Sequence, residues 1–148
     1  MLFELYPALD AFLLSMPGSV RDFQPVWQWD RYLVGGRQFA GLCRPGAAHA
    51  APYAGRPLLS LKADPAEGEF YRRQYPDILP GFYSDKRTWI SICLDGTVPW
   101  QEIQHLASRS YQLVFARLTK KAQHAILRTV PGKAGEADFS TARTEFRG

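Results

Sequence analysis

Hydrophobic positions at the start of the chain recur at helical spacing. Large apolar side chains repeat every three or four residues from Leu2 to Met16, which predicts an amphipathic helix. Pro7 either begins or bends this helix, because proline suits the first helical turn and not the interior. Pro17-Gly18 ends it. The pattern therefore predicts an N-terminal helix with one apolar face.

The next segments have the composition of strands and turns. Residues 20–29 are rich in aromatic and β-branched side chains but include Pro25, so we interpret them as an edge strand or as two strands divided by a turn. Gly35-Gly36 separates residues 32–34 from residues 37–43, which is typical of an antiparallel hairpin. Residues 44–57 are rich in Ala, Gly and Pro without periodicity, which indicates a long mobile loop.

Residues 58–63 and 88–95 alternate in the manner of half-buried strands. In the first, two leucines face one side, and Ser60 and Lys62 face the other. In the second, aliphatic side chains face one side and Trp89 faces the other. Both segments are therefore expected to be strands with one apolar side.

A helix is predicted between these two strands. Pro65 suits its first turn, Asp64 its cap, and acidic residues near the start and basic residues near the end suit its dipole. Residues 75–86, which include two prolines and a glycine, are expected to form an ordered connection that leads to the second strand.

From Pro99 onward the apolar spacing is helical again. It predicts a long helix that packs on the sheet, and Thr119 caps a shorter helix that ends near Arg128. Residues 131–148 lack a packing pattern and are expected to be disordered. The chain is thus predicted to be one α+β domain over residues 1–130, followed by a C-terminal tail.

Positive charge is concentrated in one segment. The chain has a formal net charge of +4 over 148 residues. Residues 99–130 hold five basic side chains against Glu102 alone, which accounts for the whole excess. Two interpretations stay open, a solvated outer face of an amphipathic helix and a patch that attracts nucleic acid.

The common catalytic and cofactor motifs are missing from the sequence. Gly36 and Gly41 have the glycine spacing of a P-loop, but Leu42 and Cys43 stand where Lys and Ser or Thr are required. No GxGxxG or GxSxG motif occurs, and the three histidines have no metal-ligand spacing. We therefore expect a protein that is not an enzyme and holds neither a metal nor a cofactor.

The cysteines and the N-terminal segment bear on cellular location. Cys43 and Cys93 form no CxxC pair, and two cysteines are too few for a disulfide framework, so both are expected to be reduced. Glu4 and Asp10 interrupt the first apolar run, unlike a secretory signal. No uncharged apolar stretch approaches about 20 residues. We expect a cytoplasmic monomer without a membrane segment.

Basic and aromatic residues meet at the entrance to the strand at 88–95. The segment at 83–89 places two bases, Lys86 and Arg87, beside two aromatic rings, Tyr83 and Trp89, which suits phosphate attraction followed by base contact. The alternative is that Trp89 covers part of the core while the two bases solvate the sheet edge. Both interpretations stay open on the residues alone.

Two other strands could extend this combination. Arg37 and Phe39 share one side of their strand by alternation, as Ser60 and Lys62 do on theirs. If the strands are neighbours, a basic and aromatic sheet face follows.

Several segments in succession carry a family resemblance. They are PGSVRDF at 17–23, VGGRQFAGL at 34–42, PLLSLKADP at 57–65, YPDILPGFYSDKRTWISICLDGTVP at 75–99 and SRSYQLVFARLTKK at 108–121. In this order they resemble the MmcQ/YjbR family.

The resemblance implies a two-layer α+β fold, with helices on one face of an antiparallel sheet, similar to CyaY-like and secretion-chaperone-like folds. The family is commonly labelled DNA-binding, with a "double wing" formed here by residues 32–43 and 81–95, and no enzymatic activity is attached to it. Arg37 stands where Lys is usual, and Asp85 where Asn is usual.

Three functional hypotheses follow. The first is a non-catalytic DNA-binding module. Its predicted contact residues are Arg37, Lys62, Lys86, Arg87, Trp89, Lys120 and Lys121. The second is a protein- or peptide-binding adaptor that uses the sheet face or an edge strand. The third is a module that holds a small acidic ligand between Lys62, Arg37 and Lys86.

Overall fold

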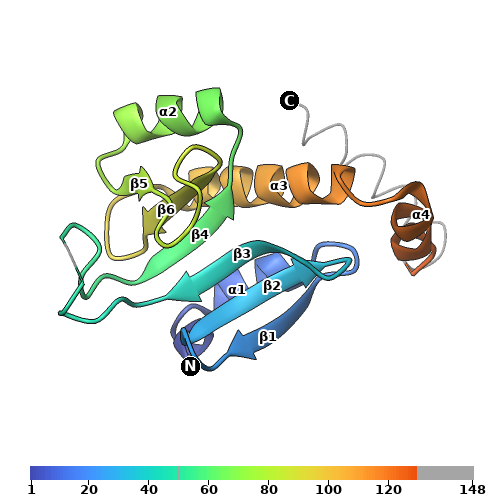
Figure 1. Ribbon diagram of the computed structural model, residues 1–148, viewed down its shortest axis with the longest axis horizontal. Helices are drawn as coiled ribbons and strands as arrows, with labels where there is room; N and C mark the ends of the chain where they lie inside the picture. The colour runs from blue at the N-terminus through green and yellow to red at the C-terminus, as the bar shows by residue number, and fades with distance from the viewer. Residues whose placement is uncertain (50, 130–148) are drawn as a thin grey trace.

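The computed structural model describes residues 1–49 and 51–129. Within them, six strands form one antiparallel sheet in the order β1-β2-β3-β4-β6-β5 (Figure 1). The strands are β1 Val20–Gln24, β2 Trp29–Val34, β3 Arg37–Cys43, β4 Leu58–Lys62, β5 Ile78–Pro80 and β6 Trp89–Cys93. The helices are η1 Leu2–Leu5, α1 Pro7–Leu14, α2 Pro65–Gln74, α3 Trp100–Ala116 and α4 Lys120–Arg128. The α+β class is confirmed, and the predicted tail at 131–148 lies outside the described residues.

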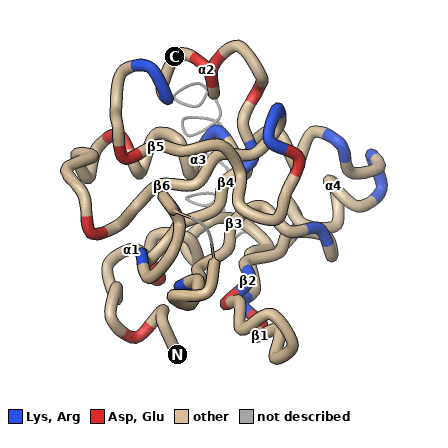
Figure 2. The backbone as a smooth tube through the Cα atoms, turned by 60° about the vertical axis from the view of Figure 1, so that its left-hand side comes forward, with Lys and Arg blue, Asp and Glu red and all other residues tan. Residues whose placement is uncertain are grey.

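The helix termini follow the local sequence signals. The Asp64 carboxylate accepts the Ala66 N–H at the start of α2, and the Thr119 hydroxyl accepts the Ala122 N–H at the start of α4. Pro7 begins α1 and separates it from η1. α2 and α4 lie well apart on the molecule (Figures 1 and 2). None of the helices in the described ranges is both long and apolar enough to cross a membrane.

The predicted hairpin and edge strand are present. Gly35 and Gly36 both have positive φ, 55° and 77°, as a two-residue turn between β2 and β3 requires. Residues 25–28 divide β1, which is an edge strand, from β2. The ordered connection at residues 75–86 includes β5, which was not predicted as a strand. β5 has three residues and ends on Pro80, so it is too short to show the alternation of apolar and polar side chains that indicates a strand.

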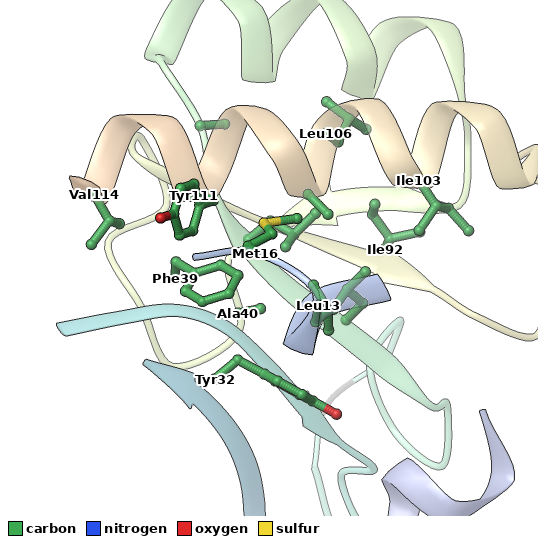
Figure 3. Close-up of a cluster of buried hydrophobic side chains, with 14 of the residues drawn as sticks. Leu13, Met16, Tyr32, Phe39, Ala40, Ile92, Ile103, Leu106, Tyr111 and Val114 are labelled. Carbon is green, nitrogen blue, oxygen red and sulfur yellow. The ribbon is translucent and has the colours of Figure 1, made fainter. Parts of the chain in front are cut away.

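The main core lies between one face of the sheet and the helices. Side chains of α1, α3 and the sheet interdigitate there, including Leu13, Tyr32, Phe39 and Ile92 (Figure 3). α2 packs on the same face, since an added Cβ at Gly68 would lie 3.4 Å from Ile90. The expected placement of the helices on one face is therefore confirmed.

A bulge in β3 changes which residues face this core. Tyr32 pairs with Ala40, and Leu33 pairs with Gln38, so Phe39 is the extra residue. The Ser110 hydroxyl of α3 donates to the Phe39 carbonyl and accepts the Lys62 N–H at 2.8 Å. The paired residues of β3 and β4 end at Ala40 and Leu61. Beyond this pair, the Ser110 hydroxyl connects the two strands.

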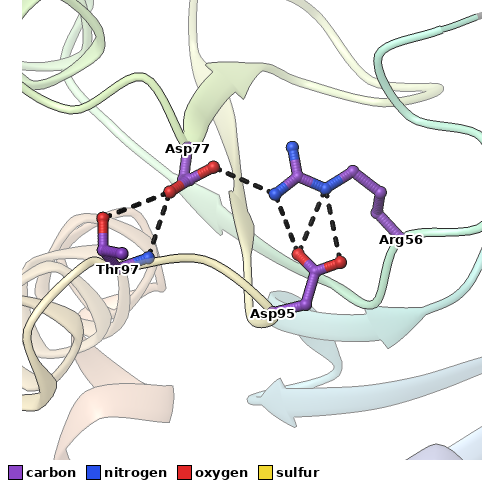
Figure 4. Close-up of polar contacts among 4 residues, drawn as sticks. All are labelled: Arg56, Asp77, Asp95 and Thr97. Carbon is purple, nitrogen blue, oxygen red and sulfur yellow. Dashed lines mark hydrogen bonds and ion pairs between the residues drawn. The ribbon is translucent and has the colours of Figure 1, made fainter.

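The described residues of the loop between β3 and β4, 44–49 and 51–57, form no helix or strand, as predicted, but side chains attach the loop to the sheet. The Tyr53 hydroxyl donates to the Pro80 carbonyl. Arg56 donates to Asp77 at 2.9 Å and to Asp95 at 2.9 Å, and Asp77 also accepts the Thr97 N–H (Figure 4). This ion-pair cluster joins the loop to the ends of β5 and β6.

Candidate functional site

The face of the sheet opposite the helices is only partly covered. A second apolar cluster lies there under the loops, formed by Cys43, Leu58, Phe82 and Cys93, with Trp29, Tyr53 and Leu79 packed against it. The remainder of this face is a groove. We call it the aromatic groove and define it by its lining residues: Gln24, Trp27, Trp29, Arg31, Gln38, Tyr83, Ser84 and Trp89.

The aromatic groove is assembled from segments far apart in the sequence. Its lining comes from β1, the 25–28 turn, β2, β3, the loop at 81–88 and β6. Its volume is about 500 Å³, within the range of pockets that hold small molecules. A second cavity of about 340 Å³, also lined by Trp27, Trp29 and Tyr83, adjoins it and extends toward His49.

Two exposed aromatic rings stand at the rim. Trp27 is 60% exposed and Tyr83 is 64% exposed, and their ring centroids are 5.6 Å apart. The Gln24 side-chain oxygen accepts the N–H groups of Val26 and Trp27, which holds the turn that carries Trp27. Exposed apolar surface of this kind is typical of binding sites.

The backbone at this rim is strained. Gln28 and Tyr83 have φ of 56° and 50°, and they are the non-glycine residues with positive φ in the described part of the chain. Such a conformation costs of order 1 kcal/mol in a non-glycine residue and is concentrated at functional sites. Both residues belong to the segments that present Trp27 and Tyr83.

Gly41 makes the floor of the groove possible. An added Cβ there would lie 2.5 Å from Trp29 Cε3 and 2.7 Å from Gln38 Nε2. Real Cβ atoms do not approach other atoms so closely, so only glycine lets the indole of Trp29 and the amide of Gln38 lie against β3 at this point.

Lys62 lies on β4 beside Trp89, a lining residue of the groove. They are direct partners in the ladder, and Lys62 Nζ lies 5.5 Å from the centroid of the Trp89 ring. Trp89 is partly exposed and lines the groove. β3 and β4 are neighbours in the sheet, which was the condition for a shared basic and aromatic face. The prediction for Phe39 was wrong, because the bulge turns its ring into the core against Tyr111.

Lys86 and Arg87 follow Tyr83 and Ser84 in the same loop. Lys86 Nζ donates to the Gly81 carbonyl at 2.9 Å and lies 5.4 Å from the Tyr53 ring. The Arg87 side chain is 85% exposed, with Nε 3.7 Å from the Asp85 carboxylate. Asp85 therefore offsets part of the positive charge at this rim.

The other predicted contact residues lie elsewhere. Lys120 and Lys121 open α4 and are exposed. Arg37 is exposed and follows the β2–β3 turn, where an added Cβ at Gly35 would meet Leu118 near the start of α4. Figure 2 shows basic segments on both α2 and α4, which are separate parts of the surface. Of the predicted contact residues, Trp89 lines the groove and Lys62 is its neighbour on β4. Lys86 and Arg87 belong to the loop that carries Tyr83 and Ser84.

Two aromatic lining residues, Trp27 and Trp29, were not singled out from the sequence, whereas Tyr83 was one of the two aromatic residues of the candidate segment at 83–89. Trp27 and Trp29 are two positions apart, the spacing that places side chains on one side of an extended chain. That signal was present in the sequence. Their proximity to Tyr83 was not, because residues 27 and 83 meet only in the folded sheet.

Three side chains with nucleophilic groups, Cys43, Cys93 and Ser110, are buried. Burial raises the pKa of the Cys43 thiol to about 12 and that of the Cys93 thiol to about 11. Both thiols are thus protonated near neutral pH, which makes them poor nucleophiles. Ser110 is fully buried and bonded on both sides to backbone groups.

Comparison with known proteins identifies the family. A family model described as YjbR matches residues 14–113. The chain belongs to the YjbR family. YjbR of Escherichia coli K12, an uncharacterized protein, is 39% identical over 57 residues, which is 38% of this chain and 48% of YjbR. The chain thus spans about half the length of that relative. YbdF of Escherichia coli O157:H7, also uncharacterized, is 26% identical over 99 residues, 67% of this chain and 75% of YbdF.

Two crystal structures have the same fold. The Deinococcus radiodurans protein DR2400, with a DUF419 domain, is 30% identical with a TM-score of 0.66, covering 80% of this chain and 84% of that one. A protein from Pseudomonas syringae is 21% identical with a TM-score of 0.60, covering 72% and 96% of the two chains. The second likeness concerns the fold alone.

Proposed function

We propose that this YjbR-family domain is a non-catalytic, cytoplasmic DNA-binding module that uses the face of the sheet bearing the aromatic groove. The observation that carries the proposal is the Lys62–Trp89 pair, which places an ammonium group over an indole at the edge of a groove lined by four aromatic rings. Cations neutralise phosphates and aromatic faces contact bases, so this combination suits nucleic acid.

Lys62, Lys86 and Arg87 supply the phosphate contacts in this proposal. Lys62 and Lys86 each lie over an aromatic ring, and within the described residues neither forms an ion pair. Arg87 forms a long ion pair with Asp85, in which Nε lies 3.7 Å from the carboxylate. Arg37, Lys120 and Lys121 lie away from the groove lining and would contact only a longer nucleic acid.

A salt titration tests the proposal. Binding of a labelled oligonucleotide is measured by fluorescence anisotropy from about 50 to 200 mM salt, where the log–log slope is near −0.9 per phosphate neutralised on a duplex and −0.7 on a single strand. We expect a slope that corresponds to two or three neutralised phosphates, and a smaller slope for the Lys62→Gln variant. Micromolar protein that binds no DNA at 50 mM salt would reject the proposal.

A second candidate function is peptide binding. Val26 is 77% exposed beside Trp27, and the turn that holds them adjoins β1, an edge strand with one partner. An extended peptide could add to this edge and place an apolar side chain against Trp27. Recovery of one protein partner in a pull-down that persists after nuclease treatment, together with no DNA binding, would favour this function.

A further inference from the structure

We propose that the aromatic groove receives an unpaired nucleobase, so that the preferred ligand is single-stranded nucleic acid. This inference rests on the DNA-binding function proposed above and specifies its substrate class. The argument comes from the accessibility of the rings, the charge inside the groove and its size.

The rings at the rim have accessible surface for stacking. Trp27 and Tyr83 are more than half exposed and stand next to each other. In a duplex, each base face is covered by the neighbouring pairs, so a protein ring cannot stack on it without unstacking the helix. Unpaired bases have available faces, and aromatic side chains are the usual platforms for them.

The interior of the groove carries little uncompensated charge. Arg31, the basic residue in its lining, donates to the Asp22 carboxylate at 2.8 and 2.6 Å. The ammonium group of Lys62 lies over Trp89, a lining residue of the groove, and that of Lys86 lies over Tyr53. This arrangement suits a neutral base inside and phosphates at the rim.

Gln38 adds polar recognition within the groove. Its side-chain amide lies at the floor beside Gly41 and provides both donor and acceptor groups. A planar amide of this kind can pair with the edge of a base. Ser84, across the groove on the 81–88 loop, contributes a hydroxyl.

The dimensions agree with one or two bases. A groove of about 500 Å³ has the volume of a small-molecule site. In a duplex the grooves present only the edges of the base pairs. A base whose faces lie among the rings of the groove must therefore have left the stack.

The test compares three fluorescein-labelled ligands at about 50 mM salt: a 20-nucleotide oligothymidine, an abasic strand of the same length, and a 20-base-pair duplex. We expect oligothymidine to bind at least ten-fold more tightly than the other two and to quench tryptophan fluorescence. Trp27→Ala should weaken oligothymidine binding by about 5- to 150-fold, the range for loss of one stacked base. Because Trp27 is exposed in a turn, this variant should keep its fold, which circular dichroism checks.

Trp100→Ala is the matched control. Trp100 is 42% exposed on α3 and its ring contacts Phe12, away from the groove lining. Its replacement should leave oligothymidine affinity within two-fold. Duplex binding equal to or tighter than single-strand binding, with Trp27→Ala unchanged, would overturn the inference and leave the proposed function intact. Absence of binding to all three ligands would reject the proposed function itself.

Discussion

Lys62 and Trp89 face each other across the β4–β6 ladder, with the ammonium nitrogen 5.5 Å from the ring centroid. If the ammonium contacts phosphate, Lys62→Gln should weaken DNA binding two- to ten-fold and reduce the salt slope by roughly one unit. Salt-dependent anisotropy measures both quantities. The control is Arg73→Gln, which removes an equal charge from an exposed Glu69 pair on α2, the opposite side of the sheet. Equal losses in the two variants would indicate a non-specific charge effect.

Ser110 and Ser60 are both buried but differ in their bonding. The Ser110 hydroxyl bonds to backbone groups of β3 and β4, whereas Ser60 Oγ has no hydrogen-bond partner among the described residues. Ser110→Ala should therefore lower the free energy of unfolding by about 1–3 kcal/mol, because two buried backbone groups lose their partner. Ser60→Ala should leave it unchanged or raise it. Urea denaturation measures both, and a larger loss in Ser60→Ala would contradict the assignment.

The Arg56 cluster should make stability depend on pH in the acid range. The hydrogen bond from Arg56, assisted by the Thr97 N–H, lowers the pKa of Asp77 below its ordinary value of 3.8. Because the pKa of Asp77 is lower in the folded protein than in the unfolded chain, its ionised carboxylate stabilises the fold at pH values above 3.8. This stabilisation is lost as the pH falls through the folded pKa.

Arg56→Gln should accordingly lower the free energy of unfolding by roughly 1 kcal/mol at pH 7, a modest value because both side chains are partly solvated. The difference from the wild type should shrink as pH falls below 3.8. Urea denaturation at several pH values measures this. A difference that stays constant from pH 7 to pH 2.5 would show that Arg56 acts through packing instead.

Gly41→Ala should remodel the groove floor. The new methyl group would meet the Trp29 ring and the Gln38 amide, so one or both must move, at a cost of about 1–3 kcal/mol. Near-ultraviolet circular dichroism and tryptophan emission should change with the loss of stability. Gly46→Ala, where an added Cβ meets no atom within 4 Å, should leave the spectra unaltered.

Cys43 and Cys93 should resist thiol reagents in the folded protein. Both are buried, with thiol pKa values raised to about 12 and 11. Both also pair with Leu58, one from each side, so a strand separates them. We expect a chromogenic disulfide reagent at pH 8 to modify neither until urea unfolds the chain, and then to modify both. Rapid labelling of the native protein would contradict the described packing.

Short-range signals in the sequence predicted most of the elements. Asp64 and Thr119 cap helices where expected, because a cap acts within three residues. Gly35-Gly36 forms the predicted turn, because only its own backbone conformation is involved. In the strand at Trp89–Cys93, Ile90 and Ile92 face the main core and Trp89 and Cys93 face the other side, as predicted, since alternation follows from the pleat.

The tertiary structure decided the position of Phe39 and the existence of the groove. Phe39 faces the core because of a bulge whose carbonyl bonds to Ser110, 71 residues away. Trp27 meets Tyr83 across 56 positions of sequence only after β1 to β6 have paired. The amino-acid sequence by itself determined the local elements, the apolar faces and the family motifs. Which side chains share the binding face depended on register and long-range packing, and no periodic pattern along the chain encodes these.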